Sequence, residues 1–106
     1  MKFSLGIALL LASVSARADI EAELARMKGF TILGAFTVTG FVEKNGKKSD
    51  SFEGCDFGRR IILDDSFTVE CEEYDYRYAY MPKAIVFGDG TSLRMLVSGR
   101  LYRIAK

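Results

Sequence analysis

The chain has 106 residues, with 15 basic and 14 acidic side chains, two cysteines and no histidine. A formal charge of +1 argues against a general binder of nucleic acids or anionic membranes. The lack of histidine removes the commonest general base near neutral pH and the commonest metal ligand. The composition therefore favours a small domain that binds a partner without catalysing a reaction.

Residues 1–18 have the pattern of a cleaved secretory signal peptide. Lys2 supplies positive charge, Phe3 to Val14 is uncharged and mostly apolar, and Ala16-Arg17-Ala18 has the small-x-small pattern of a cleavage site. The apolar stretch is shorter than the roughly 20 residues that span a bilayer. We expect a periplasmic or secreted product with no integral membrane segment after processing, in which residues 19–106 form one small β domain.

The beginning of this domain predicts a short helix followed by a hairpin. Asp19 can cap a helix that extends to Lys28, and Gly29 ends it. Phe30 to Glu43 is rich in β-branched and aromatic residues and predicts a strand, with bends or bulges at its glycines, Gly34 and Gly40. Asn45-Gly46 predicts a hairpin, because both central positions of a type I′ turn need positive φ.

The rest of the chain alternates short strand patterns with turn residues. A polar return strand is expected over Lys48 to Gly54, at an edge of the sheet. Further strands are predicted over Arg59 to Leu63, Ala84 to Phe87, Ser92 to Val97 and Arg100 to Ile104. Another is predicted to start with the alternating Phe67, Val69 and Cys71 and to end at Pro82, which cannot donate to a ladder. The expected fold is mainly β: a small antiparallel β-barrel or meander of about six strands with a short N-terminal helix. A two-layer open sheet is the alternative.

Cys55 and Cys71 are expected to form a disulfide, because both lie in the exported domain. A bridge that closes a loop of this size stabilises a small domain by about 3 kcal/mol. A metal site built on the two thiolates would need further soft or imidazole ligands, and the chain has no histidine. We therefore predict neither a metal nor a cofactor.

Four tyrosines, Tyr74, Tyr76, Tyr78 and Tyr80, alternate with other residues, so an extended backbone places all four on one face. The preceding apolar residues, up to Cys71, occupy the opposite parity. We expect a bulge near Glu72-Glu73 that turns the tyrosines toward the core. In the rival geometry the strand is unbroken and the tyrosines form an exposed stripe that can stack sugars or grip a peptide.

The charges are distributed unevenly along the chain. The stretch from Asp50 to Asp75 contains nine acidic residues and only two basic ones, Arg59 and Arg60. The stretch from Tyr76 to Lys106 contains six basic residues and one acidic residue. Either the two halves pair and neutralise each other, or they form a bipolar surface that orients a partner. The acids near Glu72 could hold a cation, but they lack the spacing of an EF-hand loop.

The segment Ser98-Gly99-Arg100-Leu101-Tyr102 resembles the Ser-Gly-x-x-Tyr segment of the small periplasmic inhibitors of c-type lysozyme. That family consists of β-barrels held by disulfides, and the resemblance implies a lysozyme-inhibitor-like protein. In the family further strands follow the motif, whereas here only Ile104 and a short tail follow it.

The leading functional prediction is a non-enzymatic interaction module of the bacterial-type envelope or periplasm. It would bind an envelope or secreted protein through the four tyrosines together with Arg77 and Lys83. The alternative is a ligand-binding module for envelope sugars or a cation, and the lysozyme-inhibitor-like protein is a further alternative. An enzyme is not expected, because the chain offers no histidine base and no nucleophile-elbow serine.

Overall fold

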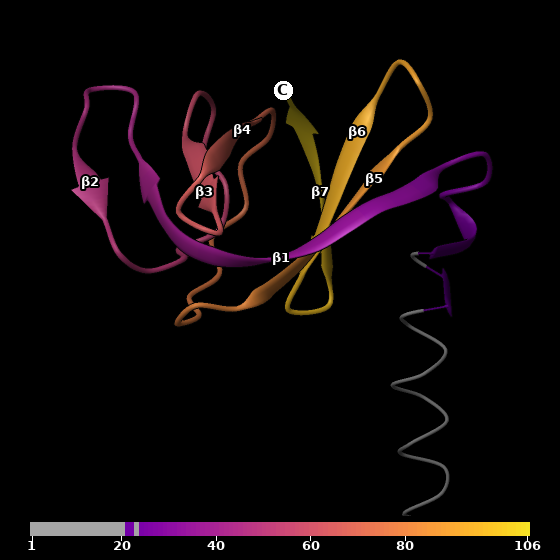
Figure 1. The fold of residues 1–106 in the computed structure, drawn as a ribbon, viewed down its shortest axis with the longest axis horizontal. Helices are drawn as coiled ribbons and strands as arrows, with labels where there is room; N and C mark the ends of the chain where they lie inside the picture. The colour runs from indigo at the N-terminus through magenta and orange to yellow at the C-terminus, as the bar shows by residue number, and fades with distance from the viewer. Residues whose placement is uncertain (1–20, 23) are drawn as a thin grey trace, which may run out of the picture.

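A computed structural model describes residues 21–22 and 24–106, and these form a mainly β structure (Figure 1). Its seven strands are β1 (Thr31–Val42), β2 (Lys48–Ser49), β3 (Arg60–Leu63), β4 (Phe67–Cys71), β5 (Lys83–Gly88), β6 (Leu93–Val97) and β7 (Arg100–Ala105). Most predicted strands are recovered close to their expected positions, but the polar return strand is reduced to the two residues of β2. The strand expected to run from Phe67 to Pro82 already ends, as β4, at Cys71.

Six of the strands close into an antiparallel barrel in the order β1-β3-β4-β7-β6-β5. Closure depends on β1, the long strand that crosses the centre of Figure 1, because its first half pairs with β5 and its second half with β3. β2 is an additional strand that pairs with the end of β1. The expected small antiparallel barrel is thus confirmed.

β1 can serve both sides of the barrel because it is irregular at two points. The register shifts between Ile32 and Gly34 in the pairing with β5, and between Val38 and Gly40 in the pairing with β3. A side chain at Gly40 would collide with the backbone carbonyl of Ser49. Both predicted glycine irregularities are therefore present, and Gly40 allows the close approach of the chain that follows β1.

The first hairpin has a different turn from the one expected. The Glu43 N–H donates to the Lys47 carbonyl at 2.7 Å, so the loop contains three residues. Only Gly46, at φ +91°, has a positive φ. The type I′ interpretation was wrong: this hairpin uses a three-residue loop that places glycine, not asparagine, in the left-handed region.

The barrel interior is filled by alternate residues of the strands. Its largest fully buried side chains include Tyr102, Phe52, Ile61, Leu63 and Met95. Cys55 and Cys71 form the predicted disulfide inside this core, with an S–S distance of 2.06 Å. A disulfide of this kind is typical of proteins that fold outside the cytoplasm.

Predictions for the N-terminus fall largely outside the described residues. The expected signal peptide, residues 1–18, lies entirely outside them, as do the first two residues of the expected helix from Asp19 to Lys28. Within that range, helical backbone is seen at Glu21, Ala22, Leu24 and Ala25, followed by a turn. Across the described residues no helix combines the length and apolar character needed to cross a membrane.

Candidate functional site

The four tyrosines lie on residues 74–80, here called the tyrosine segment, which connects β4 to β5. The residues 52–55 pair antiparallel with this segment through isolated bridges at Cys55–Asp75 and Phe52–Ala79. Each bridged pair exchanges two backbone hydrogen bonds of 2.9–3.0 Å. The segment is therefore extended and fixed to the barrel, although it belongs to none of the seven strands.

The tyrosine side chains point outward, which contradicts the prediction of buried rings. Tyr74, Tyr76, Tyr78 and Tyr80 have relative exposures of 65%, 61%, 61% and 70%. No bulge changes the parity: odd positions face inward on β4, at Val69 and Cys71, and remain the more enclosed at Asp75 and Ala79. We call the surface formed by the four rings the tyrosine face.

Asp75 occupies an inner position because other polar groups satisfy its carboxylate. Arg100 donates two hydrogen bonds to it, at 3.0 and 2.9 Å, and the Tyr102 hydroxyl donates a third at 3.2 Å. The hydrogen bonds from Arg100 hold the pKa of Asp75 below its usual range, despite partial burial. Burial and the Asp75 carboxylate raise the pKa of Tyr102 to about 12. This cluster fixes one end of the tyrosine segment.

The two basic residues predicted beside the tyrosines are held by other parts of the barrel. The Arg77 guanidinium donates to the Ser98 carbonyl at 3.2 Å, in the turn between β6 and β7. The Lys83 ammonium donates to the Thr37 hydroxyl at 2.8 Å, between β5 and β1. The structure therefore places Arg77 within the tyrosine segment and Lys83 at the beginning of the next strand.

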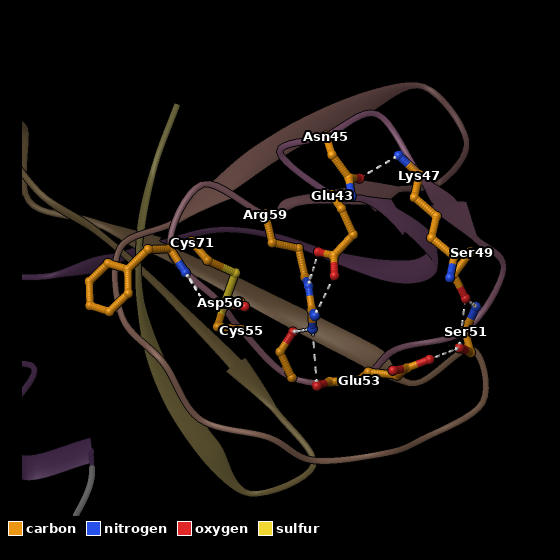
Figure 2. A network of polar contacts seen from close by, with 12 residues as sticks. Glu43, Asn45, Lys47, Ser49, Ser51, Glu53, Cys55, Asp56, Arg59 and Cys71 are labelled. Carbon is orange, nitrogen blue, oxygen red and sulfur yellow. Dashed lines mark hydrogen bonds and ion pairs between the residues drawn. A yellow bond between two sulfur atoms is a disulfide. The ribbon is translucent and has the colours of Figure 1, made fainter.

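A buried arginine holds the residues 52–55, which pair with the tyrosine segment. Arg59 donates to both carboxylate oxygens of Glu43, at 2.6 and 2.9 Å, and to the carbonyls of Glu53 and Gly54, each at 3.2 Å (Figure 2). Its guanidinium also lies 4.3 Å from the centre of the Phe41 ring. The hydrogen bond from Arg59 lowers the pKa of Glu43. Arg59 thus joins the end of β1 to the residues that carry the tyrosine segment.

Gly54 allows the two backbones to approach. Its φ is +81°, and a side chain there would collide with the Asp75 carbonyl and lie within 2.9 Å of the Tyr76 Cα. Sequence reasoning identified neither Arg59 nor Gly54, because both act on residues that are distant along the chain. The only available signal was a glycine directly before a cysteine that was expected to be bridged.

Ion pairs join the acidic and basic halves of the sequence. Arg100 pairs with Asp75 at 2.9 Å, and Arg103 pairs with Glu73 at 3.0 Å. This favours mutual neutralisation over a bipolar surface. Among the described residues, no three His, Cys, Asp or Glu side chains gather closely enough to hold a metal ion.

A hollow on the barrel surface lies away from the tyrosines. It has a volume of about 750 Å³ and is formed by the beginning of β1, the turn between β5 and β6 and the end of β7. Leu33, Leu93 and Ile104 contribute apolar surface, whereas Glu72 and Arg94 contribute charges of opposite sign. Such a mixed and open surface does not specify a ligand class.

No protein-family model matches this chain, and no curated protein or solved structure is significantly similar to it. The segment that resembles the lysozyme inhibitors forms the β6–β7 hairpin, with Ser98 and Gly99 exposed in its turn. Tyr102 of that segment is fully buried and donates to Asp75. The tyrosine of the motif is therefore a core residue here, so the tyrosine face is the stronger candidate site.

Proposed function

We propose that this protein is an exported, non-enzymatic interaction module that binds an envelope or secreted protein through the tyrosine face. The observation that carries the proposal is that four tyrosine residues, each more than 60% exposed, lie on a segment fixed by backbone and side-chain hydrogen bonds. Exposure of adjacent large aromatic groups to water is unfavourable, and such patches on soluble domains typically mark interaction sites.

The physical character of the tyrosine face suits protein recognition. Tyrosine supplies a large contact area with few rotatable bonds, so little conformational entropy is lost on binding. Its hydroxyl stays compatible with water in the free protein, and tyrosine is enriched among residues that dominate binding energy. Anchoring through Asp75 and Arg77 lowers the entropic cost further, because the segment is ordered before a partner arrives.

Export is supported by two independent features. The first 18 residues have the charge, apolar stretch and small-x-small pattern of a signal peptide. The Cys55–Cys71 bridge requires oxidising conditions to persist. Together they favour a periplasmic or secreted protein, and an intact mass that begins at Asp19 would test this assignment.

A binding role is favoured over catalysis by the available side chains. The chain has no histidine, and both cysteines are consumed by the disulfide. The ionisable groups with shifted pKa near the tyrosines, Asp75 and Tyr102, hold the segment in place, and neither belongs to the hollow between β1, the β5–β6 turn and β7. No cofactor is required for the proposed role.

The test is capture of partners from an envelope fraction with immobilised protein. The Tyr76→Ala/Tyr78→Ala double variant should lose the captured proteins while keeping its melting midpoint, since both rings are exposed. Phe57→Ala is the matched control, because Phe57 is an equally exposed aromatic residue, at 64%, outside the tyrosine segment. Equal capture by the wild type and the double variant would refute the proposal.

Envelope sugars are the second candidate, because exposed phenol rings also stack on the apolar faces of sugars. Retention on an immobilised glycan that is lost in the same double variant would favour this reading. The lysozyme-inhibitor alternative has less support, because Tyr102 is buried. It predicts inhibition of a c-type lysozyme that depends on the exposed Ser98-Gly99 turn.

A further inference from the structure

The tyrosine segment has one backbone edge in use and one edge open. The odd residues Asp75, Arg77 and Ala79 direct their N–H groups to the residues 52–55. Backbone groups of successive residues in an extended chain point to opposite edges. Within the described part of the chain, Tyr74, Tyr76, Tyr78 and Tyr80 form no backbone hydrogen bond. Their N–H and C=O groups therefore form an unpaired edge that carries the four exposed rings.

From this geometry we infer that the partner binds as an extended peptide strand, which pairs with the open edge of the tyrosine segment. This inference rests on the proposed function, because it uses the same tyrosine face. Addition of a strand to an exposed edge gains affinity from main-chain hydrogen bonds and specificity from alternate side chains. Both elements are present here in the same residues.

The spacing of the four rings matches the repeat of an extended peptide strand. Alternate residues of an extended chain are separated by about 6.8 Å, so the four tyrosines span about 20 Å. A peptide strand has the same repeat and can place a side chain beside every ring. Cross-strand pairs of aromatic residues with aromatic or β-branched residues are favourable. We therefore expect tyrosine, valine or similar residues at alternate positions of the partner strand.

The residue opposite Arg77 should be acidic. Asp75 is already engaged by Arg100 and Tyr102. The Arg77 guanidinium donates to the Ser98 carbonyl, and its charge also acts on Asp75, but no carboxylate forms an ion pair with it within the described residues. A glutamate at the centre of the bound strand would lie on the same face as Arg77, directly across from it. The partner strand is thus acidic at its centre and apolar on its other face.

A comparison of Tyr78→Pro with Tyr78→Ala distinguishes the contribution of backbone pairing to binding from that of the tyrosine ring. Tyr78→Pro removes the ring and the N–H of the open edge, whereas Tyr78→Ala removes the ring alone. The N–H of Tyr78 has no backbone partner in the described residues, and the neighbouring bonds of Arg77 and Ala79 remain available. Melting midpoints should show that both variants are folded, and Tyr76→Pro with Tyr76→Ala provides a second pair on the same logic.

The probe is an end-blocked peptide of about seven residues with tyrosine or valine at alternate positions and glutamate at its centre. We expect chemical-shift changes along the tyrosine segment and measurable binding below about 1 mM. A peptide with lysine at the centre should bind more weakly. Tyr78→Pro should weaken binding about tenfold more than Tyr78→Ala, as expected for one lost hydrogen bond and a steric obstacle.

Three results would overturn the inference. They are no binding of the glutamate peptide at about 1 mM, equal losses in the proline and alanine variants, or self-association in sedimentation that Tyr78→Pro abolishes. The last would make a second copy of this chain the occupant. If Tyr78→Pro and Tyr78→Ala reduce partner capture equally, the proposed function stands without strand pairing. If the double tyrosine variant leaves capture unchanged, the proposed function itself fails.

Discussion

Cys55 and Asp75 exchange two backbone hydrogen bonds, from the Cys55 N–H to the Asp75 carbonyl at 2.9 Å and in the reverse direction at 3.0 Å. Cys55 is also bridged to Cys71, the last residue of β4. The disulfide and this backbone pair together determine where the tyrosine segment begins. The stability of the core and the order of the candidate site are therefore linked.

Removal of the disulfide should destabilise the protein and loosen the tyrosine segment. The Cys55→Ser/Cys71→Ser variant should lose about 2–5 kcal/mol of unfolding free energy, measured by denaturant titration. Hydrogen exchange should increase at the amides of Cys55 and Asp75. Two reactive thiols in native, unreduced protein would contradict the bridge.

Substitution of Gly54 by alanine should lower the unfolding free energy by more than the strain of a positive φ alone would. Gly54→Ala combines a positive φ with a collision against the tyrosine segment, whereas Gly90→Ala, at φ +96°, meets nothing within 4 Å. We expect Gly54→Ala to cost about 1–3 kcal/mol more than Gly90→Ala in thermal or denaturant unfolding. Equal costs would show that residues 52–55 do not determine the position of the segment.

Asp75 should contribute stability that disappears in acid. Folding lowers its pKa, so its contribution is present above the unfolded value near 3.9 and is lost as pH falls through the folded-state value. Asp75→Asn should cost about 1 kcal/mol at neutral pH, because Arg100 is half exposed and water screens the pair. Unfolding titrations from neutral pH downward should show the difference from wild type shrinking; a difference independent of pH would argue against the ion pair.

Tyr102 should contribute stability that is lost at alkaline pH, whereas the contribution of Asp75 is lost in acid. Its folded-state pKa of about 12 exceeds the ordinary value of 10.0, so the folded protein retains the phenolic proton longer than the unfolded chain. Its contribution is full below the unfolded pKa and is lost as pH rises from there toward the folded value. The stability of Tyr102→Phe should fall less steeply over this range. Parallel curves would exclude the hydroxyl as the cause.

Local patterns in the sequence were sufficient for most of the fold. The alternation in Phe67, Val69 and Cys71 predicted β4, and the disulfide followed from the export context. The tyrosines were wrongly predicted to face the core, because they are more hydrophobic than the residues between them. Asp75 takes the inner position because Arg100 and Tyr102 donate hydrogen bonds to its carboxylate there. Those partners lie 25 and 27 residues away, and periodicity carries no information about them.

The role of Arg59 in holding the residues next to the tyrosine segment could not be predicted from the sequence either. Arg59 belongs to a strongly acidic stretch of the sequence, and its side chain is only 10% exposed. Burial became favourable because Glu43 and two backbone carbonyls satisfy its donors. The Asn45-Gly46 turn was located but misassigned, since loop length depends on the register of the flanking strands.

The pairing of β1 with both β3 and β5 also sets the order in which the domain can assemble. β3, β4 and the partners of the disulfide follow β1 closely, whereas β5 begins more than 40 residues after β1 does. In a chain that emerges from its N-terminus, the β3–β4 hairpin and both cysteines, Cys55 before β3 and Cys71 at the end of β4, are therefore present before the seam between β1 and β5 can close. Oxidation can shorten the path to closure, because it joins residues 55 and 71 while β1 still has a free edge. Until β5 arrives, that free edge is the part of the nascent domain most in need of protection from pairing with another chain.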